Sequence, residues 1–386
     1  MAHPMVGEVV VADLHPERVA QYASDFGIER TFGSLDELCD SDVDAIALFT
    51  QRQLHGPQVV QALRAGKHVY SAVPIAQTLD EIRAIVDAVT ETRLIYMTGE
   101  TSYYYPSTLY CRERFQNGDF GRFVYGEGQY HHDMTHFYQS FRRSGGADWK
   151  RAAGLPPMHY VTHSTSMVLS VTGARATSVS CLGFQDDHDD GVFGEGANFW
   201  DNPFSNETAL MRTSDGGMMR INEFRRLGWK GLASVQMSLI GTKGSFEEQA
   251  DSQVWSTIFP DETSNLNDLL KCEEVPAARP ASDVQDVVLK EFHSGVSQVH
   301  PVDRLPKQFA PLHSGHMGSH QFLVDDFVKA MVSNTLPPNH VWEAARYCAP
   351  GLVAHQSALR NGEHMEIPDF GEPPSDWQLL DPYRSA

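Results

Sequence analysis

The chain has 386 residues, of which 41% are hydrophobic and 21% are charged, as in ordinary globular proteins of one or two domains. Its formal net charge of −20 argues against a nucleic-acid or anionic-membrane partner, since both present negative surfaces. The five cysteines are dispersed and form no CxxC pair, which predicts a protein without disulfides or a metal site. No hydrophobic run approaches the ~20 residues of a membrane span, and the N-terminus does not resemble a signal peptide. We therefore predict a cytoplasmic protein.

The first hundred residues alternate short hydrophobic runs with amphipathic stretches. Strands that alternate with helices at this spacing indicate parallel βαβ units with right-handed crossovers. We therefore predict one half-wound open sheet of the Rossmann type. The predicted strands are Gly7–Leu14, Asp44–Phe49, His68–Ser71 and Leu94–Met97, and the predicted helices are Pro16–Phe26, Gln58–Ala65 and Thr78–Thr90.

The pattern changes beyond about Gly121, where hydrophobic and polar residues alternate as in antiparallel strands with one covered face. Gly241–Glu247 supplies a glycine turn between two of these strands. We predict an α/β protein with an incomplete Rossmann-type domain, residues 1–120, and an α+β domain, residues 121–386, whose open sheet is mostly antiparallel and whose C-terminal helices can pack back on the first domain. The predicted strands are Phe123–Tyr130, Ala176–Phe184, Thr208–Arg212, Met218–Phe224 and Ala233–Ile240, and the predicted helices are His320–Ser333 and Trp342–Ser357.

A glycine-rich cofactor loop is missing from the start of the predicted Rossmann-type sheet. Such a sheet ordinarily begins with a strand, GxGxxG and a helix whose N-terminus holds a pyrophosphate. The first predicted strand instead reaches Asp13, where an acidic residue binds a ribose hydroxyl ~20 residues after the glycines. Either the reading frame starts one βα unit further upstream, which we favour because a sheet without its central strand exposes unpaired backbone groups, or the unit and its cofactor have been lost. Asp13 would serve equally well as a cap of the following helix.

Several short motifs follow one another along the chain: Asp13-Leu-His-Pro-Glu-Arg18, Asp42-Val-Asp-Ala-Ile with Thr50 and His55, Gly66-Lys-His-Val69 with Pro74, Gly241-Thr-Lys-Gly-Ser245 and Ile367-Pro-Asp-Phe370. In order and spacing they resemble the Gfo/Idh/MocA oxidoreductases from residue 7 almost to the end. The resemblance implies an oxidoreductase that uses NAD or NADP, tightly bound if the missing N-terminal unit is present. It also implies that Asp13, Thr50, His55 and Pro74 contact this cofactor.

One departure from that family concerns proton transfer. The family's Glu-Lys-Pro is replaced by Ala72-Val73-Pro74, and valine can neither donate nor accept a proton. The NAD-dependent glycosidases of the same superfamily also carry valine before this proline. Phe120–Asp133 and Tyr160–His163 resemble segments of those glycosidases, and Glu100 matches their glutamate after the fourth strand.

The resemblance to the glycosidases implies a role for each matched residue. Tyr130 and His163 would transfer protons, and Glu100 would lie at the cofactor. The residues implied to contact the substrate are His132, Asp133, His159 and His316, although the glycosidases carry aspartate at the position of His159. His316 would serve equally well in packing at the N-terminus of a helix.

The residue pattern alone supports only part of this assignment. Tyr130 and His132 occupy alternate strand positions, so their side chains share a face, and histidine is the usual proton shuttle near neutral pH. Taken alone, Tyr130 is more often a strand residue with a satisfied hydroxyl. His159 and His163 are four apart, which also suits a metal, but no third ligand follows and we predict none. We interpret the acidic run Gln185–Asp190 as a solvated loop rather than a cation site.

We therefore expect an oxidoreductase that acts on a ring hydroxyl of a sugar or glycoside. His163 would remove the hydroxyl proton, and Tyr130 would take the acidified C–H proton if the glycosidic bond is then cleaved. Two alternatives stay open: a plain sugar or cyclitol dehydrogenase that releases NADH, and a cofactor-free sugar-binding or scaffold protein. The resemblance also implies a homodimer or homotetramer formed through the second domain.

Overall fold

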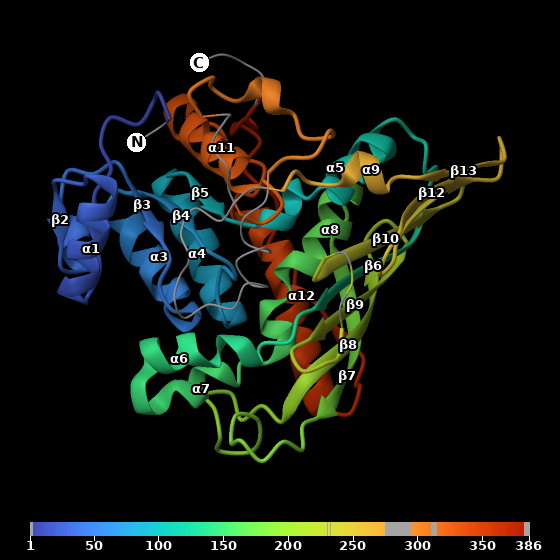
Figure 1. Ribbon diagram of the computed structural model, residues 1–386, viewed down its shortest axis with the longest axis horizontal. Helices are drawn as coiled ribbons and strands as arrows, with labels where there is room; N and C mark the ends of the chain where they lie inside the picture. Colours follow the sequence, from blue (N-terminus) through green and yellow to red (C-terminus); the bar gives the residue numbers. More distant parts are fainter. Residues whose placement is uncertain (1–2, 230, 232, 275–294, 310–314, 382–386) are drawn as a thin grey trace.

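The computed structural model describes residues 3–229, 231, 233–274, 295–309 and 315–381. Its first part consists of parallel strands with helices between them (Figure 1). Strand β1 (Val11–Ala12) pairs with β2 (Thr31–Phe32), and β3 (Ala45–Leu48), β4 (His68–Ser71) and β5 (Tyr96–Thr98) form a second parallel sheet in that order. The parallel Rossmann-like arrangement is confirmed, but the prediction of one continuous sheet is wrong, because no described strand joins β1 to β3.

The helices of this part begin where their capping residues predict. Helix α4 (Leu79–Thr92) starts after Thr78, whose hydroxyl accepts from the backbone of Glu81 while the Glu81 side chain reaches back to the Thr78 backbone, a reciprocal capping box. Pro16 occupies the first turn of α1, where its missing N–H costs nothing. The remaining helices are α1 (Pro16–Phe26), α2 (Leu35–Asp40), the short η1 (Arg52–Leu54) and α3 (His55–Arg64).

A nine-stranded sheet dominates the second part of the molecule. Its order is β13-β12-β11-β10-β6-β9-β8-β7-β14, and every neighbouring pair is antiparallel except β6 and β9, which confirms the predicted open, mostly antiparallel sheet. The strands are β6 (Phe123–His131), β7 (Ala176–Gln185), β8 (Phe204–Thr213), β9 (Met218–Phe224), β10 (Val235–Gly241), β11 (Gly244–Glu248), β12 (Gln253–Thr257), β13 (Glu262–Asn265) and β14 (Met365–Glu366).

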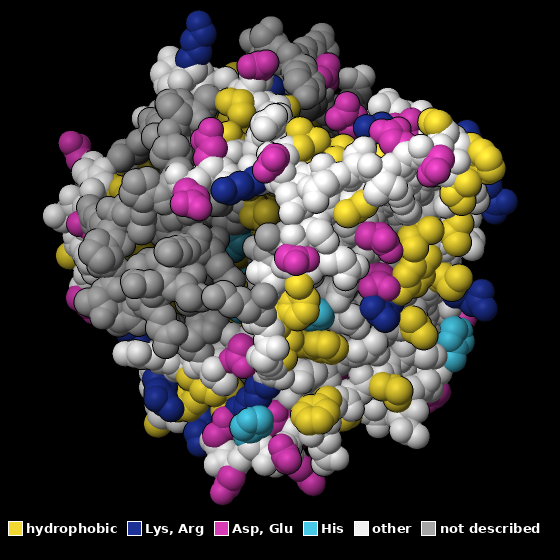
Figure 2. All heavy atoms as spheres, turned by 45° about the vertical axis from the view of Figure 1, so that its right-hand side comes forward, with side chains coloured by type: hydrophobic (Ala, Val, Ile, Leu, Met, Phe, Trp, Pro, Cys, Tyr) yellow, Lys and Arg dark blue, Asp and Glu magenta, His cyan; other side chains and the backbone are white. Residues whose placement is uncertain are grey.

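One face of this sheet is covered by helices. Figure 1 shows α12 (Val341–Leu359) running between the first part of the chain and the large sheet, and α5 (Pro106–Gln116) and α8 (Thr162–Thr172) pack on the same face. Alternation along β8 reflects this, because Ala209 and Met211 are buried while Leu210 between them is exposed. Hydrophobic side chains form patches between charged ones on the side that Figure 2 turns forward.

The C-terminal helices also contact the first part of the chain. Helix α12 packs against α4, and the backbone N–H of Thr98 donates to the carbonyl of Asn339 over 3.0 Å. The domain boundary near residue 120 stays a prediction. Among the described helices, none has the length and hydrophobicity needed to cross a bilayer. The other elements are η2 (Thr101–Tyr104), η3 (Thr135–Phe137), α6 (Tyr138–Gly145), η4 (Gly146–Asp148), α7 (Trp149–Ala153), η5 (Pro157–Tyr160), α9 (Asn267–Leu270), η6 (Val302–Arg304) and α11 (His320–Ser333).

Candidate active site

The end of β6 and the first turn of α8 bring a phenol and two imidazoles together. The hydroxyl of Tyr130 lies 2.7 Å from Nδ1 of His132, which confirms that these alternate residues share a side. The rings of Tyr130 and His163 meet edge to face with centroids 5.5 Å apart. Glycine permits this approach, because a Cβ at Gly128 would lie 2.0 Å from the carbonyl oxygen of Ser164.

Beneath His163 lies a buried carboxylate. Nδ1 of His163 donates to Oε1 of Glu100 over 2.6 Å, and neither side chain is exposed by more than 4%. The same oxygen accepts from the backbone and hydroxyl of Ser102, at 3.0 and 2.8 Å. Burial by itself raises the pKa of Glu100, but the imidazole and these donors hold it below its ordinary value. Glu100 thereby fixes the ring and leaves Nε2 of His163 as the nitrogen for proton exchange.

Two cavities meet at these side chains. The larger has a volume of about 590 Å³ and extends toward β12 and α9, where Gln253, Asp268 and Lys271 line it. The smaller has a volume of about 320 Å³ and lies between α6 and the carboxyl end of β3. Both cavities are lined by Tyr130, His163 and His316, and His132 lines the larger one. Three of the predicted site residues therefore lie where the two spaces meet.

His316 is held there by an unusual backbone. His316 and Met317 have positive φ angles of 53° and 54°, and Gly318 follows at 78°. Left-handed conformations cost non-glycine residues on the order of 1 kcal/mol each and cluster at functional sites. Burial lowers the pKa of His316 well below its ordinary value, and the neighbouring histidines His320, His163 and His132 act in the same direction. The ring is therefore neutral near pH 7.

Thr50, His55 and Pro74, three of the five residues predicted at the cofactor, follow β3 and β4 at the sheet edge where the smaller cavity lies. Thr50 lines that cavity, and its hydroxyl donates to Gln58 over 2.5 Å. The two ring nitrogens of buried His55 lie 2.7 Å from the carbonyl oxygen of Pro74 and 3.1 Å from that of Thr50, so the ring lies between the loops after the two strands and donates to one of them. Burial lowers the pKa of His55, which keeps this ring neutral.

The smaller cavity suits the nicotinamide end of a dinucleotide. Its described lining offers a hydroxyl from Thr50, an amide from Gln51, a guanidinium from Arg52 and the ring faces of Phe141 and Tyr160, but no carboxylate. A carboxyl edge of parallel strands is also where open α/β sheets bind nucleotides. The residues present therefore fit this part of the cofactor.

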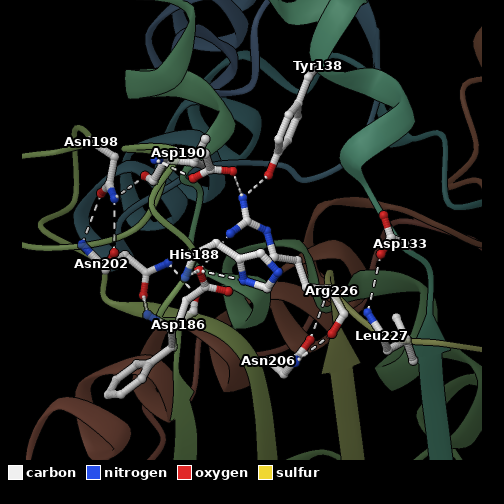
Figure 3. Close-up of polar contacts among 12 residues, drawn as sticks. Asp133, Tyr138, Asp186, His188, Asp190, Asn198, Asn202, Asn206, Arg226 and Leu227 are labelled. Carbon is white, nitrogen blue, oxygen red and sulfur yellow. Dashed lines mark hydrogen bonds and ion pairs between the residues drawn. The ribbon is translucent and has the colours of Figure 1, made fainter.

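The other predicted residues lie apart from this meeting point. Asp13 accepts from the backbone of His15 over 2.8 Å and faces Arg18 at 3.9 Å. Asp133 accepts from the backbone of Thr135 and, over 3.3 Å, from that of Leu227 (Figure 3). His159 is buried, with Nδ1 3.2 Å from Oε1 of Gln77. None of the three lines either cavity.

Within the described ranges, no cluster of three or more histidine, cysteine or acidic side chains is suited to a metal ion. The acidic run after β7 is engaged by an arginine, and the prediction of a solvated loop is wrong for its first aspartate. Nη1 of Arg226 donates to Asp186 over 2.6 Å, and Nη2 donates to Asp190 and to the hydroxyl of Tyr138 (Figure 3). Asp186 has 1% of its side chain exposed. The cluster anchors α6, which closes one side of the smaller cavity.

Sequence reasoning missed a second ion pair beside Tyr130. Nη2 of Arg225 donates to Oε2 of Glu223 over 2.6 Å, and Glu223 also accepts from the hydroxyl of Ser164. Burial raises the pKa of Glu223 to about 7, although Arg225 and Ser164 act to lower it. The sequence carried a signal, because Met219, Ile221 and Glu223 alternate onto the covered face of β9 and a carboxylate is out of place there.

Comparisons with known proteins agree with this architecture. Residues 4–100 match the family model described as "Oxidoreductase family, NAD-binding Rossmann fold". The chain is 23% identical to glycosyl hydrolase family 109 protein 1 of Bacteroides thetaiotaomicron, over 98% of this chain and 82% of that protein. It is 42% identical to 1,5-anhydro-D-fructose reductase of Ensifer adhaerens over 94 residues. These residues make up only 24% of this chain and 28% of the reductase.

A solved structure shares the fold over nearly the whole chain. An oxidoreductase from Agrobacterium radiobacter in complex with NAD+, L-tartaric acid and magnesium superposes with a TM-score of 0.69 at 14% identity, over 93% of this chain and 90% of that one. At this identity the likeness establishes the fold of both parts of the molecule.

Proposed function

We propose that the chain works as a Gfo/Idh/MocA NAD-binding oxidoreductase, which oxidises a ring hydroxyl of a sugar or glycoside and then cleaves the glycosidic bond. The observation that carries the proposal is the meeting of the Glu100–His163 and Tyr130–His132 pairs where the two cavities join. The likeness to a family 109 glycosyl hydrolase over 98% of the chain supports the cleavage step.

The smaller cavity would hold the nicotinamide end of NAD, and Thr50, Gln51 and Arg52 would contact it. When bound, the cofactor supplies a hydride acceptor and later returns the hydride. The larger cavity would hold the sugar, whose hydroxyls meet amide, carboxylate and ammonium groups from Gln253, Asp268 and Lys271. We propose NAD rather than NADP because the solved relative carries NAD+.

His163 would remove the proton from the reacting hydroxyl. Its Nδ1 is engaged by Glu100, so Nε2 accepts the proton and the carboxylate stabilises the imidazolium that forms. Both side chains are buried, which strengthens this interaction compared with the same pair in water. The O–H bond of the sugar breaks, and its carbinol carbon becomes a ketone.

Tyr130 would act in the second stage. A ketone acidifies the neighbouring C–H bond, and the Tyr130 oxygen takes that proton while its own proton passes to Nδ1 of His132, 2.7 Å away. The electron pair of the broken C–H bond forms a C=C bond, and the substituent on the next carbon departs with the electrons of its own bond. Addition of water and reduction then complete the cleavage without net oxidation.

A single experiment separates this proposal from its alternatives. The protein is supplied with NAD and a panel of nitrophenyl glycosides while released nitrophenol and accumulated NADH are both followed. Nitrophenol release without lasting NADH supports the proposal, and steady accumulation of NADH identifies a plain dehydrogenase. Sugar binding without either product, measured by calorimetry, identifies a non-enzymatic sugar-binding protein.

Tyr130→Phe tests the assignment of the second stage. This variant keeps the ring and removes the hydroxyl, so a burst of NADH of about one per site is expected while nitrophenol release falls by about 10²–10⁴-fold. Rapid-mixing absorbance measures both. Equal loss of the two signals would show that Tyr130 only positions the substrate.

We further propose that a second copy of the chain covers the outer face of the large sheet. Four large hydrophobic side chains are exposed there on three neighbouring strands: Leu182 and Phe184 on β7, Leu210 on β8 and Met218 on β9.

We also propose that the protein is located in the cytoplasm. All five cysteines are free thiols in the structure, which supports a reducing compartment.

A further inference from the structure

A guanidinium lies against the ring of the proposed acid–base tyrosine. The central carbon of Arg225 is 4.4 Å from the ring centroid of Tyr130, and Arg225 is 7% exposed. Arg225 directly follows the last residue of β9, and Glu223 of β9 pairs in parallel register with Tyr130 of β6. Oε2 of Glu223 accepts from Nη2 of Arg225 over 2.6 Å. Strand register and this ion pair therefore hold the cation over the phenol.

The arrangement continues toward the proposed cofactor cavity. Arg225 also lies 5.7 Å from the ring centroid of Tyr160, and Arg52 lies 4.6 Å from the same ring. Because Arg52 follows β3, the series Arg52–Tyr160–Arg225–Tyr130 spans the space between the parallel strands and the large sheet. A cation over an aromatic face is attracted by the electrons of the ring, and the attraction grows when the phenol loses its proton.

Burial works against ionisation of Tyr130. It raises the pKa of this phenol well above its ordinary value, whereas the Arg225 cation lowers it. The other groups that face Tyr130 are His132, His163, Tyr105, Tyr160 and Glu223. Among them, Tyr160, Tyr105 and the Glu223 carboxylate disfavour a phenolate, and His132 is the proton acceptor. Arg225 therefore supplies the charge that compensates a developing phenolate.

We propose that Arg225 is a positioning residue that stabilises the phenolate form of Tyr130 during proton transfer, with Glu223 holding its guanidinium over the ring. This inference rests on the proposed acid–base role of Tyr130. In this proposal the Arg225–Glu223 pair accelerates the elimination step and has no part in the first oxidation. A residue that merely supported the fold would affect both steps alike.

The test compares three variants of the whole protein. Arg225→Met removes the charge but keeps much of the volume, Arg225→Lys keeps the charge, and Arg220→Met serves as control. Arg220 lies on β9, the strand that Arg225 follows; its side chain pairs with Glu127 and is 40% exposed. Nitrophenol release and the NADH burst are measured across pH with nitrophenyl glycosides. Arg225→Met should slow nitrophenol release about tenfold or more near neutral pH, move its rise to higher pH and leave the burst intact.

Glu223→Gln provides the opposite perturbation. It removes the negative charge that disfavours the phenolate but keeps an acceptor for Arg225, so the rise in nitrophenol release should move to lower pH. Arg225→Lys should restore most of the rate lost in Arg225→Met, and Arg220→Met should behave as wild type. The inference would be overturned if the pH at which nitrophenol release rises moved in the same direction in Arg225→Met and Glu223→Gln. Equal loss of the NADH burst and of nitrophenol release in Arg225→Met would overturn it as well.

A second readout needs no substrate. Protein labelled with ¹³C at the ζ carbon of tyrosine is titrated by nuclear magnetic resonance, and Tyr130→Phe identifies the Tyr130 signal. The Tyr130 signal should titrate at higher pH in Arg225→Met than in wild type and at unchanged pH in Arg220→Met. If wild type cleaves no glycoside but this difference is found, the proposed function fails while the effect of Arg225 stands; an unchanged titration overturns the effect of Arg225 alone.

Discussion

Glu100 and His163 show how a buried contact decides the chemistry of one side chain. The carboxylate holds Nδ1 of the imidazole at 2.6 Å and also accepts from Ser102, so neither ring rotation nor tautomer change is free. The sequence placed Glu100 at the cofactor by resemblance, and that role stays a prediction. Its contact with His163 could not be predicted, because it joins residues 63 positions apart that only packing of η2 against α8 brings together.

His163→Gln and Glu100→Gln should have different effects on turnover. Glutamine at 163 preserves volume but cannot accept a proton, so kcat for both the NADH burst and nitrophenol release should fall by about 10²–10⁴-fold. Glutamine at 100 keeps a hydrogen bond and loses the charge that stabilises the imidazolium, so a smaller loss of about tenfold is expected. Stopped-flow kinetics give both values, with circular dichroism as the folding control. Near-normal kcat in His163→Gln would remove this residue from the mechanism.

At the scale of elements, periodic segments were predictable and buried or very short ones were not. Helices α1 and α11 and strands β4 and β9 begin and end at the predicted residues. Strand β2 has two residues and carries no periodic signal. Helix α8 was missed because almost all of its residues are buried, including four serines and threonines in its first five positions, so no polar face marks it. Glu223 was missed because its position next to Tyr130 depends on the β6–β9 register.

Gly128→Ala should separate α8 from β6. The added Cβ would lie 2.0 Å from the carbonyl oxygen of Ser164, and a helix backbone cannot yield as a flexible side chain can. The free energy of unfolding should fall by about 1–3 kcal/mol, and catalysis should fall with it because His163 is displaced. Urea denaturation measures the first quantity. Gly228→Ala is the matched control, since nothing lies within 4 Å of its added Cβ; equal stability of the two variants would contradict the close packing.

Glu223 should make the protein less stable as the pH rises. Burial raises its pKa from 4.5 to about 7 in the folded state, so between these values the folded protein binds a proton that the unfolded chain has released. The free energy of unfolding must then decrease with pH across this interval, and its contribution is complete below pH 4.5. Urea denaturation from pH 4 to 8, on the order of one measurement per half pH unit, should show this slope in wild type and a flatter one in Glu223→Gln. Parallel curves would refute the shifted pKa.

The molecule as a whole places its chemistry between two kinds of sheet. Parallel strands supply one wall of the smaller cavity, and the end of an antiparallel sheet supplies the phenol and the imidazoles. The alternation of residues predicted both kinds of sheet, and the change near Gly121 marked where one follows the other. The split between β1–β2 and β3–β4–β5 was not predictable from alternation, because periodicity reports which strands exist and not which of them pair.

Charge on the outer face of the large sheet should disrupt the proposed assembly. Leu210 is 61% exposed and lies at the centre of the hydrophobic group on β7, β8 and β9, so Leu210→Glu would place a carboxylate in the interface and weaken association by at least about tenfold. Light scattering coupled to gel filtration gives the mass of each variant. Val332→Glu, on α11 and 58% exposed, is the control. A wild-type protein that is monomeric at all concentrations would exclude the assembly.

Because Tyr130, His163 and His316 line both cavities, a ligand in either cavity contacts the same three side chains. Thermodynamic reciprocity then requires that whatever the sugar does to the affinity for dinucleotide, the dinucleotide does equally to the affinity for sugar. The side chains common to both cavities would carry this coupling.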